Sequence, residues 1–206
     1  MIKPKILLVL LLAIPTCIFA QNGFSLKLNY VKPSGEAFAT KYEPAVGFQF
    51  HWNFSYMEDQ LQAAFFTGYY KLKPYNEIIV QVNEDNNLIT ENYGEYRAIP
   101  FGLVTDFKLF SVLDDKLSPI LGADYFFERI KHSKHTITTE EDLDSEKFWV
   151  RGITFKAEVM YEINKKMTAS IGLGYSFKSS SAYYIPDILN RHKIWDSYIK
   201  YKYYIN

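Results

Sequence analysis

Residues 167–177 read MTASIGLGYSF, with an apolar residue at every odd position and a small or polar residue at every even position. Alternation over this length predicts a β-strand with one apolar and one polar face. The same period recurs along the rest of the chain, so that eight strands are predicted. Their ranges are 23–30, 45–54, 61–73, 95–110, 119–131, 148–163, 167–178 and 194–206.

The N-terminus differs from the rest of the chain. Lys3 and Lys5 precede an apolar run over residues 6–14, and the small residue Ala20 follows. This order is typical of a cleavable signal peptide, and the run is shorter than the ~20 apolar residues of a spanning helix. We therefore expect residues 1–20 to be a signal peptide and residues 21–206 to form one exported domain.

Composition excludes several classes of function for the exported domain. The only cysteine, Cys17, lies in the predicted signal peptide, so disulfides and thiolate sites are excluded; its acylation in a lipoprotein is the alternative. Without Lys3 and Lys5, 21 of the 23 basic residues remain against 23 acidic ones, a formal charge of −2. That balance gives no basic field for a nucleic acid. The 17 Tyr and 16 Phe residues favour strands.

The connections between the predicted strands alternate in length. Those at 55–60, 111–118 and 164–166 are short, whereas those at 31–44, 74–94, 132–147 and 179–193 are long and polar. An outer-membrane barrel has short periplasmic turns and long extracellular loops. The sequence thus predicts an all-β protein of the bacterial outer membrane, an eight-stranded antiparallel up-and-down transmembrane β-barrel. In the second long connection, two short apolar runs predict that the hairpin continues beyond the membrane.

Glycine indicates which face of each strand points into the barrel. The polar face carries Gly47, Gly68, Gly102, Gly122, Gly152, Gly172 and Gly174. An exposed exterior gains nothing from glycine, whereas the lumen of an eight-stranded barrel is just wide enough for side chains to fill. We therefore expect the apolar face to point into lipid. The expected lumen charges nearly cancel and so predict a closed interior. They are Lys27, Asp106, Lys108, Asp124, Glu128, Lys156, Glu158, Glu162, Asp196, Lys200 and Lys202.

Two sets of outward residues are expected near the membrane interfaces. Aromatic girdles are predicted from Trp52, Phe54, Phe107 and Tyr161 near the short turns and from Tyr30, Tyr69, Trp149 and Trp195 near the long loops. A basic rim beside the long loops is predicted from Lys71, Lys73, Arg97, Arg129, Lys131 and Arg151. Such cations suit the phosphates of lipopolysaccharide; the alternative is that they only extend from the interface into water.

Four short segments resemble the small outer-membrane β-barrel proteins common in Bacteroidetes, the PorT-like group, and eight-stranded barrels of the OmpA and OmpX type. The segments are 23–30 (GFSLKLNY), 96–103 (YRAIPFGL), 118–125 (SPILGADY) and 171–175 (IGLGY). The resemblance implies an outer-membrane location and, for some members, a part in type IX secretion. It implies no catalytic residue. The chain departs from the usual aromatic C-terminus of such barrels by ending in Asn206.

The leading function is a structural or interaction protein of the envelope without enzymatic activity or cofactor, in contact with outer-membrane lipid and with envelope or secretion proteins. One alternative is a soluble, lipocalin-like barrel that binds an apolar ligand with its two faces exchanged. Another is a lipid-modifying enzyme that uses His51 or Glu158, although no serine can be placed beside His51. His132 and His135 with the acidic run 140–144 could form a metal site. The alternative is that these residues belong to a charged loop in water that binds no metal.

Overall fold

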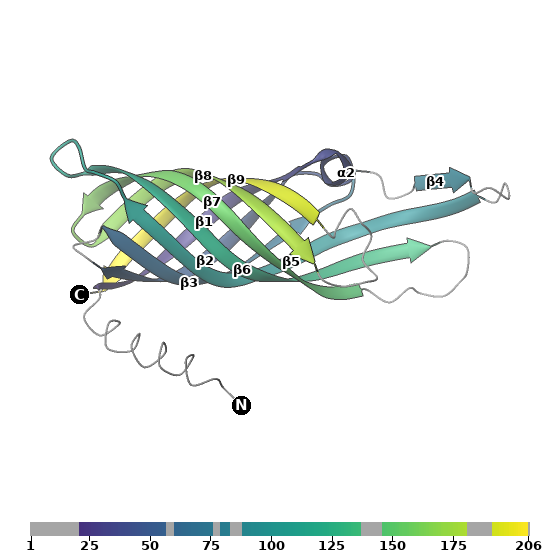
Figure 1. Cartoon of the computed structure of the whole chain (residues 1–206), viewed down its shortest axis with the longest axis horizontal. Coiled ribbons are helices and arrows are strands. Elements are labelled where there is room, and N and C mark those ends of the chain that lie inside the picture. Colours follow the sequence, from purple (N-terminus) through teal and green to yellow (C-terminus); the bar gives the residue numbers. More distant parts are fainter. Residues whose placement is uncertain are drawn as a thin grey trace, which may run out of the picture.

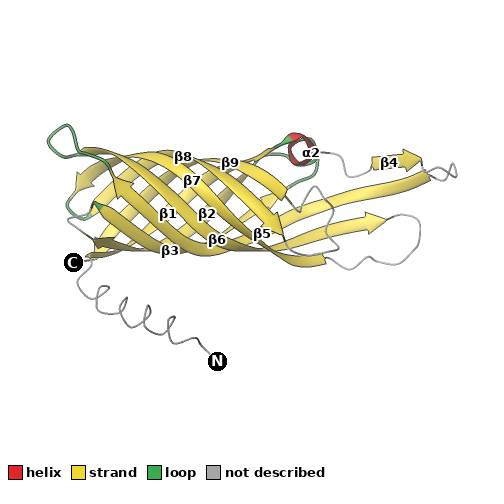
Figure 2. Ribbon diagram, in the orientation of Figure 1, coloured by secondary structure: helices red, strands yellow, loops and turns green. Residues whose placement is uncertain are grey.

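The computed structural model describes residues 21–56, 60–75, 79–82, 88–136, 146–180 and 191–205. The predicted signal peptide therefore lies outside the described residues. Within them the chain is almost entirely β-strand (Figures 1 and 2). The elements are β1 (Gln21–Ser34), α2 (Glu36–Ala39), β2 (Ala45–Tyr56), β3 (Leu61–Leu72), β4 (Ile79–Val82), β5 (Leu88–Lys108), β6 (Leu117–Thr136), β7 (Glu146–Asn164), β8 (Met167–Ser180) and β9 (Arg191–Ile205).

The strands close into a barrel. Their order is β3-β2-β1-β9-β8-β7-β6-β5, and pairing of β3 with β5 joins the two edges. Each strand pairs antiparallel with its neighbour, and β1 meets β9 with Asn22 opposite Ile205. The fold is therefore the predicted closed, eight-stranded antiparallel barrel. Closure also removes the unpaired strand edges that an open sheet would expose.

The ninth strand, β4, lies outside the barrel wall. It pairs only with the start of β5, with Ile79 opposite Glu91, and extends this hairpin well beyond the barrel (Figure 1). This is the continuation that the two apolar runs predicted. The strands β1, β5, β6 and β7 are longer than their predicted ranges, because the alternation weakens in the polar loops while the backbone pairing continues.

The connections separate the two ends of the barrel. Lys165 and Lys166 form the turn between β7 and β8, and the turn between β5 and β6 contains Leu113, Asp114 and Asp115 with positive φ. These connections lie at the same end as the C-terminus of β9 (Figure 1). The connection between β1 and β2, which contains α2, lies at the opposite end (Figure 1). The other three predicted long connections contain residues outside the described part of the chain.

Side chains alternate between an exposed and a buried face on every barrel strand. On β8, Ile171 and Leu173 are 64% and 59% exposed, whereas Ser170 and Ser176 are 4% and 6% exposed. Large apolar side chains thus cover the outside, whereas the inside holds small and charged side chains together with buried aromatic ones. The described residues contain no helix that is long and apolar enough to cross a membrane.

The long-loop end of the lumen is apolar and aromatic. The short helix α2, which the sequence did not predict, places Phe38 against Tyr42, Tyr96 and the ring of His192. Phe38 is only 2% exposed. Tyr96 and His192 are also joined by a hydrogen bond of 3.0 Å between the hydroxyl and Nε2. The first long loop therefore turns inward and covers this end of the lumen.

Candidate functional site

The middle of the lumen holds a network of ion pairs that joins four strands. Lys156 on β7 lies 2.8 Å from Asp106 on β5 and 2.8 Å from Asp124 on β6. Lys200 on β9 lies 2.7 Å from Glu158 and 3.5 Å from Asp106. All of these side chains are less than a tenth exposed. Each buried charge has an opposite charge beside it, which offsets part of the cost of removing it from water.

Two further ion pairs lie in the lumen. Lys27 is 2.6 Å from Asp196, and Lys178 is 2.6 Å from Glu128. Lys178 also donates a short hydrogen bond to the Tyr70 hydroxyl. The first pair joins the neighbouring strands β1 and β9, and the second joins β8 to β6 across β7. The hydrogen bond from Lys178 to Tyr70 on β3 reaches the opposite side of the barrel wall.

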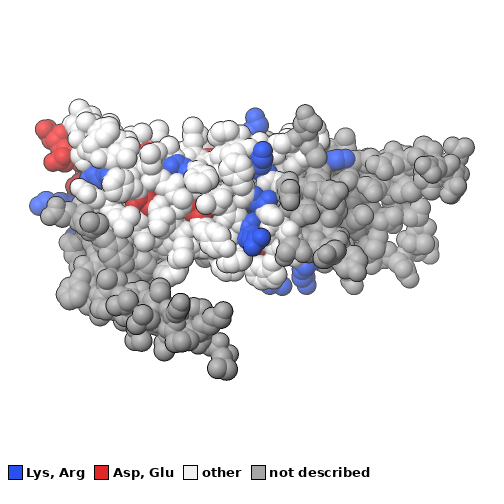
Figure 3. Space-filling view, viewed as in Figure 1, with Lys and Arg blue, Asp and Glu red and all other residues white. Residues whose placement is uncertain are grey.

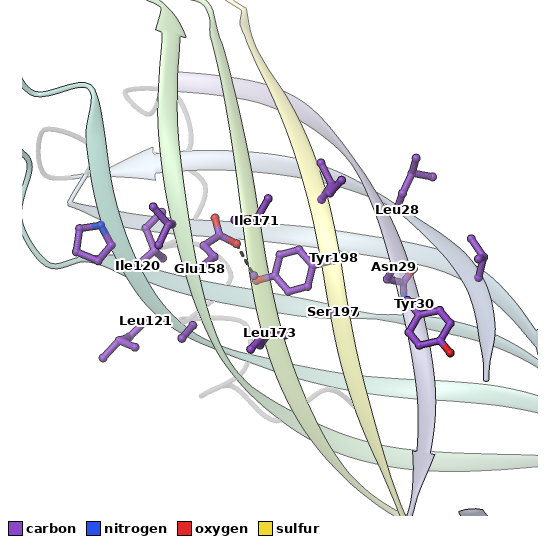
Figure 4. Close-up of a pocket in the computed structure, with 16 residues that line it drawn as sticks. Leu28, Asn29, Tyr30, Ile120, Leu121, Glu158, Ile171, Leu173, Ser197 and Tyr198 are labelled. Carbon is purple, nitrogen blue, oxygen red and sulfur yellow. Dashed lines mark hydrogen bonds between the residues drawn. The ribbon is translucent and has the colours of Figure 1, made fainter. Parts of the chain in front are cut away.

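Glycine makes room for this network. The Tyr198 hydroxyl donates a 2.8 Å hydrogen bond to Glu158, and Figure 4 shows the ring pointing at that carboxylate. A Cβ on Gly172, between the two, would lie 2.4 Å from Tyr198 Cζ. At Gly122, a Cβ would lie 2.1 Å from the Asp106 carboxylate. The glycines of the inner face are therefore positions where the long side chains of neighbouring strands need the space.

The lumen is filled. The cavity that Lys27, Gln49, Glu128 and Lys178 help to line has a volume of about 30 Å³. Such a space holds about one water molecule. Above it, Val31, Tyr70, Leu72 and further apolar side chains pack into one cluster. The interior is thus closed by paired charges in the middle of the lumen and by packed apolar and aromatic residues at the long-loop end.

The structure places nine of the eleven expected lumen charges inside the barrel, buried. Lys108 and Glu162 also lie on the inner register, but they are half-exposed at the short-turn end. Sequence reasoning missed Lys178, the partner of Glu128, although it has the same even parity as Gly172 and Gly174. With Lys178 included, five lysines and five carboxylates are buried in the described lumen.

The six residues of the expected rim lie on the outer register, and the structure separates them into two groups. Glu95 ion-pairs with Lys71 and, at 2.6 Å, with Arg97. Glu95 lies beyond the apolar part of β5, and hydrogen bonds from Lys71 and then Arg97 hold the pKa of its carboxyl below the ordinary value. The charge on this side of the rim is therefore partly neutralised.

The other side of the rim is not neutralised. Among the described residues, Arg129, Lys131 and Arg151 are exposed and form no ion pair. Lys131 stands directly opposite Arg97 on one neighbouring strand and Lys147 on the other. Like charges in direct cross-strand positions destabilise a sheet. The stability of the sheet therefore does not explain why Arg97, Lys131 and Lys147 are aligned across three strands. In Figure 3, Lys and Arg atoms gather in a band across the barrel towards the long-loop end. Lys73, directly after the end of β3, is also exposed.

Aromatic residues of the outer face lie near both ends of the barrel. Seven of the eight expected girdle residues are at least 36% exposed; they are Tyr30, Trp52, Tyr69, Phe107, Trp149, Tyr161 and Trp195. Phe54 departs from the expectation with 7% exposure, and its ring contacts those of Trp52 and Phe65. Between these residues the outer surface is apolar, with aliphatic side chains and further aromatic ones such as Phe50 and Phe155. A hollow of about 750 Å³ there is lined by Leu121, Leu173 and other apolar side chains (Figure 4).

Of the candidate catalytic and metal residues, the structure describes the side chains of His51 and Glu158. His51 is buried in the lumen, 3.3 Å from Gln49. The sequence alone could not place a serine beside His51; strand register puts Ser25 opposite it, and the Ser25 hydroxyl is hydrogen-bonded to Asn53. The side chains of His132 and His135 and the run 140–144 lie outside the described residues. Within the described part no group of His, Cys, Asp or Glu could hold a metal ion.

The geometry defines a class: a closed eight-stranded barrel with an apolar exterior and a charged interior, as in transmembrane barrels. The crystal structure of Neisserial surface protein A has this fold, with a TM-score of 0.62 and 10% identity over 89% of this chain and 97% of that one. The outer membrane protein OprG from Pseudomonas aeruginosa is also similar (TM-score 0.45, 12% identity, 91% and 97% covered). A major outer membrane protein from Thermus thermophilus gives a TM-score of 0.45 and 10% identity, with 89% and 99% covered.

No protein-family model matches the chain, and no curated protein sequence matches it. At about one identical residue in ten, the likeness to the solved structures concerns the fold alone.

Proposed function

We propose that this chain is a structural or interaction protein of the bacterial outer membrane, with the short turns in the periplasm and the long loops outside. The observation that carries the proposal is the inversion of polarity across the barrel wall. Ile171 and Leu173 are more than half exposed, while Lys156 and Asp106 are buried and paired. Water would not stabilise such an apolar exterior, whereas the acyl chains of a bilayer do.

The filled lumen supports an interaction protein over a pore. Within the described residues, the lumen cavity has a volume of only about 30 Å³, and Phe38 of α2 packs into the apolar cluster at the long-loop end. Channels of this architecture use more strands, because a lumen of eight strands is taken up by side chains. What the protein can offer to partners is its outer surface, above all the long-loop end with its extended β5 hairpin.

The alternatives are less well supported. A lipocalin-like barrel needs its apolar face inside and a ligand-sized cavity; the faces have the opposite arrangement here. A lipid-modifying enzyme needs its reacting groups within reach of lipid. Both His51 and Glu158 are buried in the lumen, and Glu158 is engaged by Lys200 and Tyr198. A PorT-like role in a secretion assembly remains a prediction from the sequence resemblance.

The topology can be tested by labelling single cysteines in a Cys17→Ser background. Glu43→Cys reports on the long-loop end and Lys165→Cys on the short-turn end, and both native side chains are exposed. In intact cells, an impermeant maleimide should label Glu43→Cys alone. Lys165→Cys should react once the outer membrane is permeabilised, which is the internal control for its reactivity.

Other labelling patterns would contradict the proposal. Labelling of Lys165→Cys alone would reverse the orientation. Recovery of both reactive cysteines in a soluble periplasmic fraction, without detergent, would exclude a membrane protein altogether.

A further inference from the structure

A second hollow lies on the outer face near the basic rim. Its volume is about 480 Å³, and β6, β7, β8 and β9 contribute to it. Tyr125, Ile153 and Phe177 follow one another across three adjacent strands and form its apolar wall. One register step closer to the long loops, Arg151 stands opposite Ser179. The hollow therefore has an apolar part towards the membrane and polar groups at its outer end.

Lys193 supplies a second cation. It is paired with Phe177 across β8 and β9, and its ammonium group lies 5.8 Å from the centre of the Phe177 ring. Arg151 on β7, Ser179 on β8 and Lys193 on β9 all line the hollow. Arginine provides a planar fork of donors, and serine and lysine add single donors. Together they form a set suited to a tetrahedral oxyanion.

The side-chain donors of Arg151, Ser179 and Lys193 form no ion pair or hydrogen bond within the described part of the chain. Neither Arg151 nor Lys193 forms an ion pair there, in contrast to Lys71 and Arg97, which share Glu95. The Ser179 hydroxyl likewise makes no hydrogen bond with a described residue. Extension of long side chains from the interface into water explains exposed cations. It does not explain why they flank a hollow with an apolar wall.

We propose that this hollow binds the lipid A part of lipopolysaccharide, with a phosphate held by Arg151, Lys193 and Ser179 and an acyl chain lying against Tyr125, Ile153 and Phe177. The inference rests on the proposed function, because that topology puts the long-loop end in the leaflet that contains lipopolysaccharide. Charge complementarity identifies the occupant: Arg151 and Lys193, which form no ion pair with a described residue, suit an anionic headgroup, and the apolar wall suits a hydrocarbon chain.

The test measures lipid binding to the folded chain in detergent micelles by native mass spectrometry. Purified lipopolysaccharide is titrated against the unaltered chain and two double variants, with phosphatidylglycerol as competitor. The first variant is Arg151→Gln with Lys193→Gln. The second is Lys71→Gln with Arg97→Gln, a matched control that also loses one arginine and one lysine from the rim. Circular dichroism confirms folding of each.

The first variant should lose about tenfold or more in affinity, because charge-assisted hydrogen bonds to the phosphate disappear. The control should lose less than about threefold, since Glu95 already neutralises that pair. Dephosphorylated lipopolysaccharide should bind the unaltered chain as weakly as intact lipopolysaccharide binds the first variant. Phe177→Ala should also weaken binding, without changing the dependence on phosphate.

Three results would overturn the inference. Equal losses in the two double variants would indicate general attraction to a basic rim. Undiminished binding by the first variant would exclude the hollow. Equal competition by phosphatidylglycerol would exclude a preference for lipopolysaccharide. Because binding is measured in micelles, any of these results leaves the cysteine-labelling topology standing, and a reversed topology would be detected by labelling alone.

Discussion

Replacement of Lys156 by methionine should strongly destabilise the barrel. Lys156 is 4% exposed and lies 2.8 Å from both Asp106 and Asp124. Methionine keeps most of the side-chain volume but leaves two buried carboxylates without this cation. Removal of one partner from a buried ion pair costs roughly 3–5 kcal/mol. Asp106 retains Lys200 at 3.5 Å, whereas Asp124 forms no other ion pair in the described part of the chain.

A double variant separates the cost of losing the Lys156–Asp124 ion pair from the cost of leaving the Asp124 carboxylate buried without a cation. When Asp124→Leu is combined with Lys156→Met, no unpaired carboxylate remains at that position, and Asp106 keeps Lys200. The double variant should recover at least about 2 kcal/mol relative to Lys156→Met, within the range of coupling between residues in contact. Lys165→Met, in an exposed turn, is the control for loss of a positive charge and should change stability by less than about 0.5 kcal/mol.

The assay is reversible unfolding by urea in phospholipid bilayers, followed by tryptophan fluorescence. All three tryptophans, Trp52, Trp149 and Trp195, are about half exposed on the outer face. Their emission should shift to the red as they leave lipid for water. A cost below about 1 kcal/mol for Lys156→Met would contradict a buried, paired lumen, as would additive effects of the two substitutions.

Three other substitutions test separate parts of the barrel. Ile171→Arg, midway along the outer face of β8, should cost about 2–4 kcal/mol in the same unfolding assay; a cost near zero would mean that this face does not meet lipid. Gly172→Ala puts a methyl 2.4 Å from Tyr198 Cζ and should cost about 1–3 kcal/mol, clearly more than Gly174→Ala, whose nearest atom is 3.0 Å away. Phe38→Ala removes the aromatic cover, yet planar-bilayer recordings should show no new conductance, because the ion pairs below still fill the lumen; an open channel would refute the plug.

The alternation of residues predicted the strands and their two faces because one residue in two points inward whatever the register. Glycine then indicated the inner face. Neither signal depends on how far one strand slides along the next. Alternation and glycine therefore predicted that Lys156 and Asp106 both point into the lumen. They could not predict that the two side chains form an ion pair, because this depends on the register of β5, β6 and β7.

Features that depend on register or on short local structure could not be predicted. Ser25 lies opposite His51 only because of the β1–β2 stagger, which alternation does not determine. The four residues of α2 are too few for a helical period. The hollow beside Arg151 depends on four neighbouring strands at once, and Lys193 lies just outside the range predicted for the last strand.

The most direct test of the central claim is quenching of tryptophan fluorescence in bilayers of lipids brominated on their acyl chains. An apolar face turned to lipid predicts strong quenching of Trp52, Trp149 and Trp195 and little quenching by iodide in the water. Efficient iodide quenching with no effect of the brominated lipids would contradict the claim, because the apolar face would then not lie against the membrane.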